Sequence, residues 1–440
     1  MPRPGKNNST VLIHIKLNMS ASPRHALFGL LLVYASFNAG AGTPQILLPD
    51  IRLKPEQLGI IINDEDPLSR QIADYYRKVR QIPDSNLIHV RLDPHNARVQ
   101  PNTFLSIWNE VQQKTPATIE AYALTWAKPY RVGCMSITTA FAAGFDKRWC
   151  SASQCAPTQK NPLFDSRSAA PWQQFRIRPT MSIAALDFPR AKQLIDRGKR
   201  SDNSWPAGTA YLLSTSDRAR NVRSVFFPRI KTLFRDLLPV RILQQDVLRN
   251  RKDILFYFTG KLRVGGLDSL SFLPGAVADH LTSTGGQLTD SRQMSALRWL
   301  EAGATGSYGT VTEPCNLPGK FPNPGILMNH YLHGRSLLRS YWASVQMPGE
   351  GLFIGDPLAH PFAGYRIEST TNNQYRLITH QLWPGRYAVQ TAPSLLGPFS
   401  RPISLINASL VQTEFYLPET PAPIYRILPL NPRQPDDNRS

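Results

Sequence analysis

Cys315 and His280 are the residues best placed to act as a nucleophile and its base. Cys315 follows the apolar run 306–311, so its thiol would lie just past the end of a predicted strand. A cysteine nucleophile needs a base, usually a histidine, and backbone donors for the oxyanion. His280 is the best available base, and Glu313 or Asp279 would orient it. The sequence thus suggests a cysteine hydrolase site, with a buried or disulfide-bonded Cys315 and a structural His280 as the alternatives.

Other polar residues form a candidate binding set. In open parallel sheets, ligands bind beyond the carboxyl ends of the strands, where the loops converge. Asp64 and Asp66 could bind a hard cation or act as acid and base, but an aspartate before Pro67 is also typical of a helix N-cap. Gly285-Gly286 lacks the lysine of a phosphate-binding loop and the dinucleotide fingerprint, so no cofactor is predicted. The full set is Asn63, Asp64, Asp66, Asp217, Arg218, Thr282, Ser283, Gly285, Gly286 and Lys320.

In an oxidising compartment the four cysteines could form disulfides. Cys150 and Cys155 lie five positions apart and are predicted to close a small disulfide loop. No histidine or second cysteine pair lies close by, so no metal site is predicted. Cys134 and Cys315 could pair with each other, stay buried as thiols or be functional.

Short apolar runs alternate with helical periods from residue 58 onward, which is typical of βαβ units and a largely parallel sheet with helices on both faces. We predict an α/β domain over 42–362, with an irregular excursion at about 150–180, then a small β-rich, sandwich-like domain over 363–417 and a proline-rich flexible tail over 418–440. The predicted strands are 58–62, 86–92, 119–125, 181–186, 208–215, 240–246, 254–258 and 306–311, and the helices are 67–79, 103–114, 189–197, 218–238 and 291–302.

The N-terminal region is typical of a secretory leader. Arg24 and His25 precede the apolar run 26–37, and small residues follow it, so we expect cleavage after Ala41, with Met19 as the true start. The run is too short to span a bilayer, so a periplasmic or secreted protein is predicted.

Fifty Lys and Arg against 31 Asp and Glu give a net charge of +19, and removing the four basic residues of 1–41 leaves +15. Export and the lack of a zinc-finger or RNP signature argue against nucleic acid. Anionic envelope polymers or lipid head groups are the expected partners, and a basic surface that serves only solubility is the alternative. The sequence leaves the oligomeric state open.

Several motifs together resemble an uncharacterised exported family of bacteria that carry exosortase, the membrane enzyme proposed to sort proteins with a C-terminal Pro-Glu-Pro tag. The resemblance implies a context of envelope sorting and extracellular polymer production, and it assigns no catalytic residue. The C-terminus lacks the tag, so the chain looks like an accessory factor. The motifs lie at 61–69, 129–138, 281–286, 309–316, 320–322 and 355–358.

A more distant similarity is to cysteine peptidases of the caspase and gingipain type. They share an α/β sheet with His after one strand and Cys after the next, and gingipain-like enzymes carry a β-sandwich after the catalytic domain. This chain departs from the pattern, because Thr259-Gly260 stands where those enzymes have His-Gly. Two hypotheses follow: an exosortase-associated cysteine hydrolase that uses Cys315 and His280, or a non-catalytic protein that binds an anionic polymer or a sorting component.

Overall fold

A computed structural model of the chain describes residues 43–151, 155–370, 374–419 and 422–430. The expected leader, with its cleavage position after Ala41, lies outside the described residues. No helix in the described ranges is long and apolar enough to cross a membrane.

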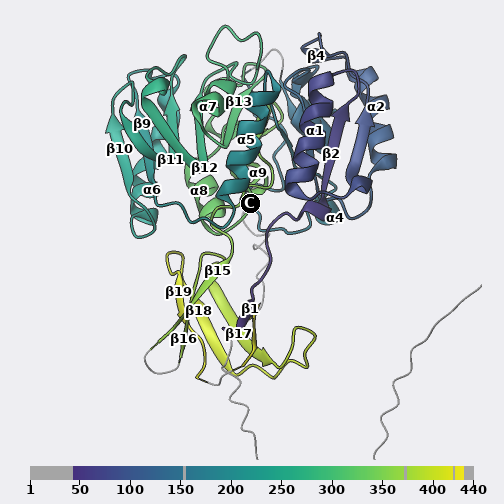
Figure 1. Ribbon diagram of the computed structural model, residues 1–440. Helices are drawn as coiled ribbons and strands as arrows, with labels where there is room; N and C mark the ends of the chain where they lie inside the picture. The colour runs from purple at the N-terminus through teal and green to yellow at the C-terminus, as the bar shows by residue number, and fades with distance from the viewer. Residues whose placement is uncertain (1–42, 152–154, 371–373, 420–421, 431–440) are drawn as a thin grey trace, which may run out of the picture. The chain divides into compact units, whose positions relative to one another are not determined.

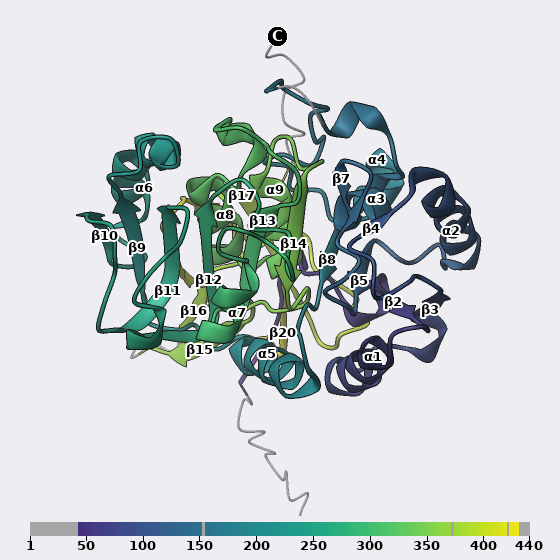
Figure 2. The ribbon, with the colours of Figure 1, turned by 90° about the horizontal axis from the view of Figure 1, so that it is seen from above.

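The larger domain is built on one ten-stranded sheet (Figures 1 and 2). The first five strands of the sheet order are parallel to one another, as are the last four. β14 lies between the two groups and runs antiparallel to β13. In spatial order the strands are β10 (Val240–Gln244), β9 (Thr209–Ser214), β11 (Arg251–Gly260), β12 (Leu270–Leu281), β13 (Gly306–Thr310), β14 (Gly351–Gly355), β8 (Thr180–Ser182), β5 (Ala121–Leu124), β2 (Leu58–Asn63) and β3 (Leu87–Val90).

Helices cover both faces of this sheet, which confirms the predicted α/β class. Figure 2 shows α1 and α5 on one face and α6, α8 and α9 on the other. The helices are α1 (Pro67–Arg80), α2 (Pro101–Lys114), α3 (Ile137–Ala143), α4 (Pro171–Phe175), α5 (Phe188–Ser201), α6 (Phe227–Phe234), α7 (Leu297–Ala302), α8 (Pro324–Leu332) and α9 (Leu337–Ser344).

Local sequence explains α1 well. The Asp66 carboxylate accepts a hydrogen bond from the Leu68 amide at 2.9 Å, and Pro67 occupies the first helical position, where its missing N–H costs nothing. Ile72 and Tyr76 lie one turn apart and are fully buried against the sheet. The helix ends where Gln81 takes the left-handed conformation, with φ of 55°.

The region around β12 differs from the sequence prediction. The sequence prediction places no strand between 258 and 306 and a helix over 291–302, but Leu270–Leu281 is a long strand and the helix is limited to α7. This strand is difficult to predict from the sequence because it contains Gly275 and the polar residues Asp279 and His280. Both polar side chains are nevertheless buried. The predicted helix 218–238 also shrinks to α6, because 221–226 winds as a 3₁₀-helix.

The C-terminal β unit contains two small sheets. β1 (Gln45–Leu47), β20 (Ile424–Pro429), β17 (Gly385–Ala392) and β18 (Ser404–Ala408) form one, and β15 (Tyr365–Ser369), β16 (Tyr375–Thr379) and β19 (Glu414–Tyr416) form the other. A third small sheet, in the larger domain, joins β4 (Arg98–Val99), β6 (Arg131–Val132) and β7 (Met135–Ser136).

The prediction of a flexible tail from 418 is wrong for 424–429. These residues form β20, which pairs in parallel with β1 and antiparallel with β17. Ile427 and Tyr425 on this strand are fully buried in the core of the β unit, so their burial favours an ordered strand despite the prolines nearby.

Candidate functional site

The loops that follow β5, β12 and β13 meet and form the best-defined polar region of the larger domain. The Tyr130 hydroxyl, after β5, donates to Asp290, after β12, at 2.6 Å. The Thr312 hydroxyl, after β13, donates to the Cys134 carbonyl at 2.9 Å. Strand-end loops therefore do converge, as the sheet rule predicts.

Both disulfides are attached to this region, and they correct the predicted pairing. Cys134 bonds to Cys150 and Cys155 bonds to Cys315, with Cα–Cα distances of 5.7 and 5.6 Å. A Cys150–Cys155 bridge is therefore ruled out in this structure. Cys155 follows α3, so its bond to Cys315 joins the segment after α3 to the loop after β13 across 160 residues of chain. Sequence proximity does not reveal that contact.

Cys315 does not have the thiol that a nucleophile requires. Its sulfur is bonded to Cys155, and a disulfide sulfur carries no proton for a base to remove. The Glu313 carboxylate accepts a hydrogen bond from the Cys315 backbone N–H at 2.8 Å. Glu313 therefore stabilises the turn that presents the disulfide, and its contact is to the backbone of Cys315 and not to His280.

His280 is held as a neutral, buried side chain inside β12 and not in a loop after a strand. Its Nδ1 accepts a hydrogen bond from the Trp299 indole at 2.9 Å, so Nε2 carries the ring proton. Burial lowers the pKa of His280 to about 3. At neutral pH this ring has neither a free acceptor nor the basicity to activate a thiol, which contradicts its predicted role as a general base.

Asp279 is oriented toward a different partner from the predicted one. Its carboxylate pairs with the Arg223 guanidinium at 2.6 Å, and both side chains are buried. Successive residues of a strand point to opposite faces of the sheet, so Asp279 and His280 point away from each other. Burial raises the pKa of Asp279, and the charge of Arg223 opposes that rise.

The loop after β12 makes contacts within the protein. Thr282 donates from its hydroxyl to the Gln293 side chain at 2.6 Å and accepts from Arg220 at 3.3 Å. The Ser283 carbonyl accepts from Thr310 at 2.9 Å.

The glycine pair beside this loop serves packing. The Gly286 amide donates to the Thr310 carbonyl, and a Cβ at Gly286 would lie only 2.5 Å from the Gly309 oxygen. The Gly285 carbonyl accepts from the Ala296 amide. The pair thus lets two backbones approach closely, and this contact explains it without a bound phosphate.

The residues after β2 have structural partners. Asn63 is buried, and its side chain bonds both the N–H and the carbonyl of Leu92, at 2.9 Å each. Asp66 caps α1, as the capping alternative predicts. Asp64 lies 2.7 Å from the His89 ring on the exposed surface. No group of three or more metal-ligating side chains occurs among the described residues.

Of the remaining predicted binding residues, Asp217 and Arg218 lie at the surface and Lys320 is buried. Asp217 pairs with Arg220 at 3.1 Å, while Arg218 is exposed. Lys320 is fully buried and bonds Glu350 at 2.9 Å. Lys320 therefore belongs to the interior, which contradicts its assignment to a binding surface.

A cluster of basic residues lies at one end of the ten-stranded sheet, in the part of the chain where the sequence indicates a basic amphipathic helix over 218–238. Residues 217–263 contain twelve Lys and Arg against four Asp and Glu, a surplus of eight. We call the exposed members that form no salt bridge within the described ranges the basic edge. Arg229 and Lys231 lie on α6 and Arg241 on β10, and the others lie on β11 or in the loops after β9, β10 and β11, among the first three strands of the sheet (Figure 1). The members of the basic edge are Arg218, Arg229, Lys231, Arg241, Arg249, Arg251, Lys252 and Arg263.

The geometry of α6 explains why its charges face solvent. Phe227, Ile230 and Phe234 recur at helical spacing and are buried, so Arg229 and Lys231 point outward. The salt bridges of this segment use Arg220, Arg223, Arg235 and Lys261, and none of the eight exposed bases forms one within the described ranges. A count of charges in a sliding window along the sequence would have found this cluster.

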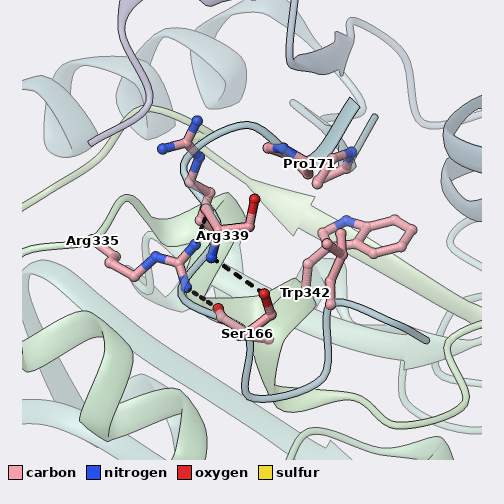
Figure 3. Close-up of a pocket in the computed structure, with 9 residues that line it drawn as sticks. Ser166, Pro171, Arg335, Arg339 and Trp342 are labelled. Carbon is pink, nitrogen blue, oxygen red and sulfur yellow. Dashed lines mark hydrogen bonds between the residues drawn. The ribbon is translucent and has the colours of Figure 1, made fainter. Parts of the chain in front are cut away.

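The void drawn in Figure 3 is too small for an organic ligand. Its volume is about 10 Å³, room for one water molecule. Arg335 donates to the Ser166 carbonyl at 2.6 Å (Figure 3). Arg339 donates to the Ala169 carbonyl at 2.7 Å. Burial lowers the pKa of Arg335 to about 9, so this guanidinium remains charged at neutral pH and is solvated by backbone oxygens. A second void, of about 80 Å³, lies between the start of α5 and α7.

Comparison with known proteins finds distant matches among solved structures. No protein-family model matches the chain, and no curated protein matches it. Among solved structures, the chain is similar to one titled "Structure of Protease", with 10% identity, a TM-score of 0.43, and 78% of this chain and 88% of that chain covered. It is also similar to the Arg-specific cysteine proteinase gingipain R, with 9% identity, a TM-score of 0.44, and coverage of 87% and 93%.

A complex of gingipain pro- and mature domains from Porphyromonas gingivalis matches with 9% identity, a TM-score of 0.40, and coverage of 85% and 93%. At this identity neither the reaction nor the residues of those peptidases transfer to the present chain.

Proposed function

We propose that this protein binds an anionic polymer through the basic edge and does so without covalent chemistry. The eight exposed Lys and Arg residues without salt bridges are the observation on which the proposal rests. A cluster of like charge raises the local concentration of a polyanion and strengthens its binding at low salt. The export predicted from the leader makes a carboxylated or sulfated envelope polysaccharide the expected ligand class, and the exosortase resemblance supports the same location.

The cysteine hydrolase hypothesis has less support. It needs a free Cys315 thiol beside a basic imidazole, whereas Cys315 is bonded to Cys155 and His280 is neutral and bonded to Trp299. The binding hypothesis uses exposed bases that form no salt bridge within the described ranges. We therefore favour the non-catalytic binding protein.

Removal of three charges from the basic edge tests this function. The variant Arg229→Gln/Lys231→Gln/Arg241→Gln should bind fluorescent dextran sulfate about tenfold more weakly than the unaltered protein at 50 to 100 mM salt. The estimate follows from roughly 0.5 kcal/mol for each exposed ion pair and 1.4 kcal/mol for each tenfold change. The measurement is fluorescence anisotropy across a salt series.

The matched control, Arg98→Gln/Lys147→Gln/Lys160→Gln, removes the same charge from exposed positions outside the basic edge. Equal weakening by both variants would show that net charge alone attracts the polymer. Binding that does not change with salt would contradict the proposal. Recovery of the native protein from the periplasmic or extracellular fraction checks the export that the proposal assumes.

A further inference from the structure

The outer face of the four-stranded sheet of the β unit is unusually apolar. The inner face holds Tyr387, Val389 and Ile427, which are buried in the core of the unit. Antiparallel sheets of this kind normally present polar side chains on the opposite, solvated face. Here Ala388 pairs with Leu405 on one side and with Leu428 on the other, so all three share the outer face.

These outer leucines are open to solvent. Leu405 is 51% exposed and Leu428 is 38% exposed, while Ile403, two positions before Leu405, is 41% exposed. Leu430, two positions after Leu428, extends the same row. With Ala388 between them they form an exposed apolar patch on β18 and β20, flanked on the same face by Arg386, Asn407 and Gln390. An exposed apolar patch with a polar rim is the kind of surface that marks an interaction site.

The connection between β17 and β18 adds an apolar tip to this face. Its segment Pro393-Ser394-Leu395-Leu396-Gly397-Pro398 places two adjacent leucines at the surface. Leu396 is 98% exposed and Leu395 is 50% exposed. A leucine with almost no protein contact gains nothing from folding and is favourable only where another apolar phase receives it.

The charges around the face are all positive. Arg386 lies on its outer row and Arg401 beside the tip, and both are exposed and form no salt bridge with any residue of the described ranges. Arg426, on β20, lies over the Phe399 ring at 3.5 Å and bonds Gln390. The segments 43–48, 385–408 and 424–430, which build this sheet and its tip, contain no Asp or Glu.

The acidic residues of the β unit lie elsewhere. Glu368 is on β15 and Glu414 is on β19, and both pair with Arg376 within the other sheet. Glu419 follows β19. The separation leaves the sheet of β17 and β18 without an acidic side chain in the segments that build it.

We propose that this face, with its Leu395-Leu396 tip, docks the protein onto the surface of an anionic lipid bilayer. Apolar side chains that enter the boundary between head groups and acyl chains, flanked by arginines that meet lipid phosphates, are the combination that binds such a surface. A fully protruding pair of leucines can enter between head groups, whereas a protein partner would need a pocket to receive it. This site is separate from the basic edge and its ligand is different, so the two proposals stand or fall independently.

Vesicle binding by the full chain tests the docking directly. In co-sedimentation, the protein should bind vesicles of phosphatidylglycerol and phosphatidylcholine at 1:3 and bind pure phosphatidylcholine at least about tenfold more weakly. Leu395→Ser/Leu396→Ser should lose about tenfold or more in affinity, because two apolar side chains no longer enter the bilayer. The control Leu186→Ser/Val225→Ser changes side chains that are 50% and 71% exposed in the larger domain and should bind normally.

Two further variants separate the contributions and the partner class. Arg386→Gln/Arg401→Gln should lose the preference for phosphatidylglycerol, whereas the triple variant of the basic edge should keep it. In Leu396→Trp, the indole emission should shift to the blue on vesicles if the tip enters the bilayer. No vesicle binding, an unshifted emission, or concentration-dependent self-association that Leu395→Ser/Leu396→Ser abolishes would overturn the proposal, the last by assigning the face to a second copy of the chain.

Discussion

Removal of the Cys155–Cys315 disulfide should destabilise the protein more than removal of the Cys134–Cys150 disulfide. The reason lies in the unfolded chain, where a bridge restricts the segment that it closes. The two bridges close segments of 160 and 16 residues. With the loop-entropy relation, these lengths correspond to about 5 and about 3 kcal/mol at 25 °C.

The burial of Cys150 reduces the expected difference in the free energy of unfolding between the two variants. Cys150 is 7% exposed, so its replacement by Ala also removes a buried sulfur, at a cost of about 1 kcal/mol. Cys155 is exposed and adds little of this kind. We therefore expect the long-loop variant, Cys155→Ala/Cys315→Ala, to be the less stable by about 1 to 2 kcal/mol.

Urea unfolding followed by tryptophan fluorescence and by far-UV circular dichroism measures the difference. Peptide mapping without reductant should first find Cys134 joined to Cys150 and Cys155 joined to Cys315 in the unaltered protein. Equal stability of the two variants, or a larger loss for Cys134→Ala/Cys150→Ala, would refute the chain-entropy reasoning. A Cys315 that reacts rapidly with an alkylating probe would instead reopen the nucleophile hypothesis.

Three further predictions concern buried groups. Lys320→Met should destabilise the fold by about 3 to 5 kcal/mol because it leaves the buried Glu350 unpaired, and Lys320→Met/Glu350→Leu should recover most of the loss in urea titrations. Burial lowers the pKa of His280 to about 3 in the folded state, whereas the unfolded value is 6.5. The contribution of the neutral ring to the free energy of unfolding is therefore complete above pH 6.5. As the pH falls from 6.5 toward 3, the unfolded chain takes up the proton first, and the free energy of unfolding falls by about 1.4 kcal/mol per pH unit. His280→Gln should therefore flatten the stability profile between pH 6.5 and 4.5, and an unchanged slope would contradict the assigned protonation state. Gly286→Ala should lower the melting temperature strongly, because its Cβ meets the β13 backbone at 2.5 Å, whereas Gly285→Ala, with its nearest contact at 3.3 Å, should be tolerated better.

Much of the fold could be predicted because short stretches of the sequence determine its helices and strands. Buried parallel strands such as Leu58–Asn63 are continuous apolar runs, and α1 has both its cap and its apolar stripe in the sequence. β12 escaped prediction since Gly275, Asp279 and His280 suggest a loop. Their burial depends on Arg223 and Trp299, which come from other elements.

The candidate site was less predictable for the same reason. The placement of strand-end loops side by side was anticipated, but the pairing of Cys155 with Cys315 depends on which loops touch. Lysine and glutamate usually lie on the protein surface, so the sequence alone does not indicate that Lys320 and Glu350 are buried. Their ion pair with each other offsets the free-energy cost of that burial. A count of charges along the sequence could have found the basic edge. Such a count could not have shown that these residues form no salt bridges.

The pairing of β1 with β20 has a consequence for how the chain completes its fold. The three residues of β1 are among the first of the described chain to be synthesised, and their partners 424–426 are among the last. During synthesis or export, β1 has no strand to pair with until residues 424–426 have emerged. Ile46, buried in the folded unit, would stay exposed in any product that stops before β20. Proteases that recognise exposed apolar segments would therefore remove products that lack β20 selectively.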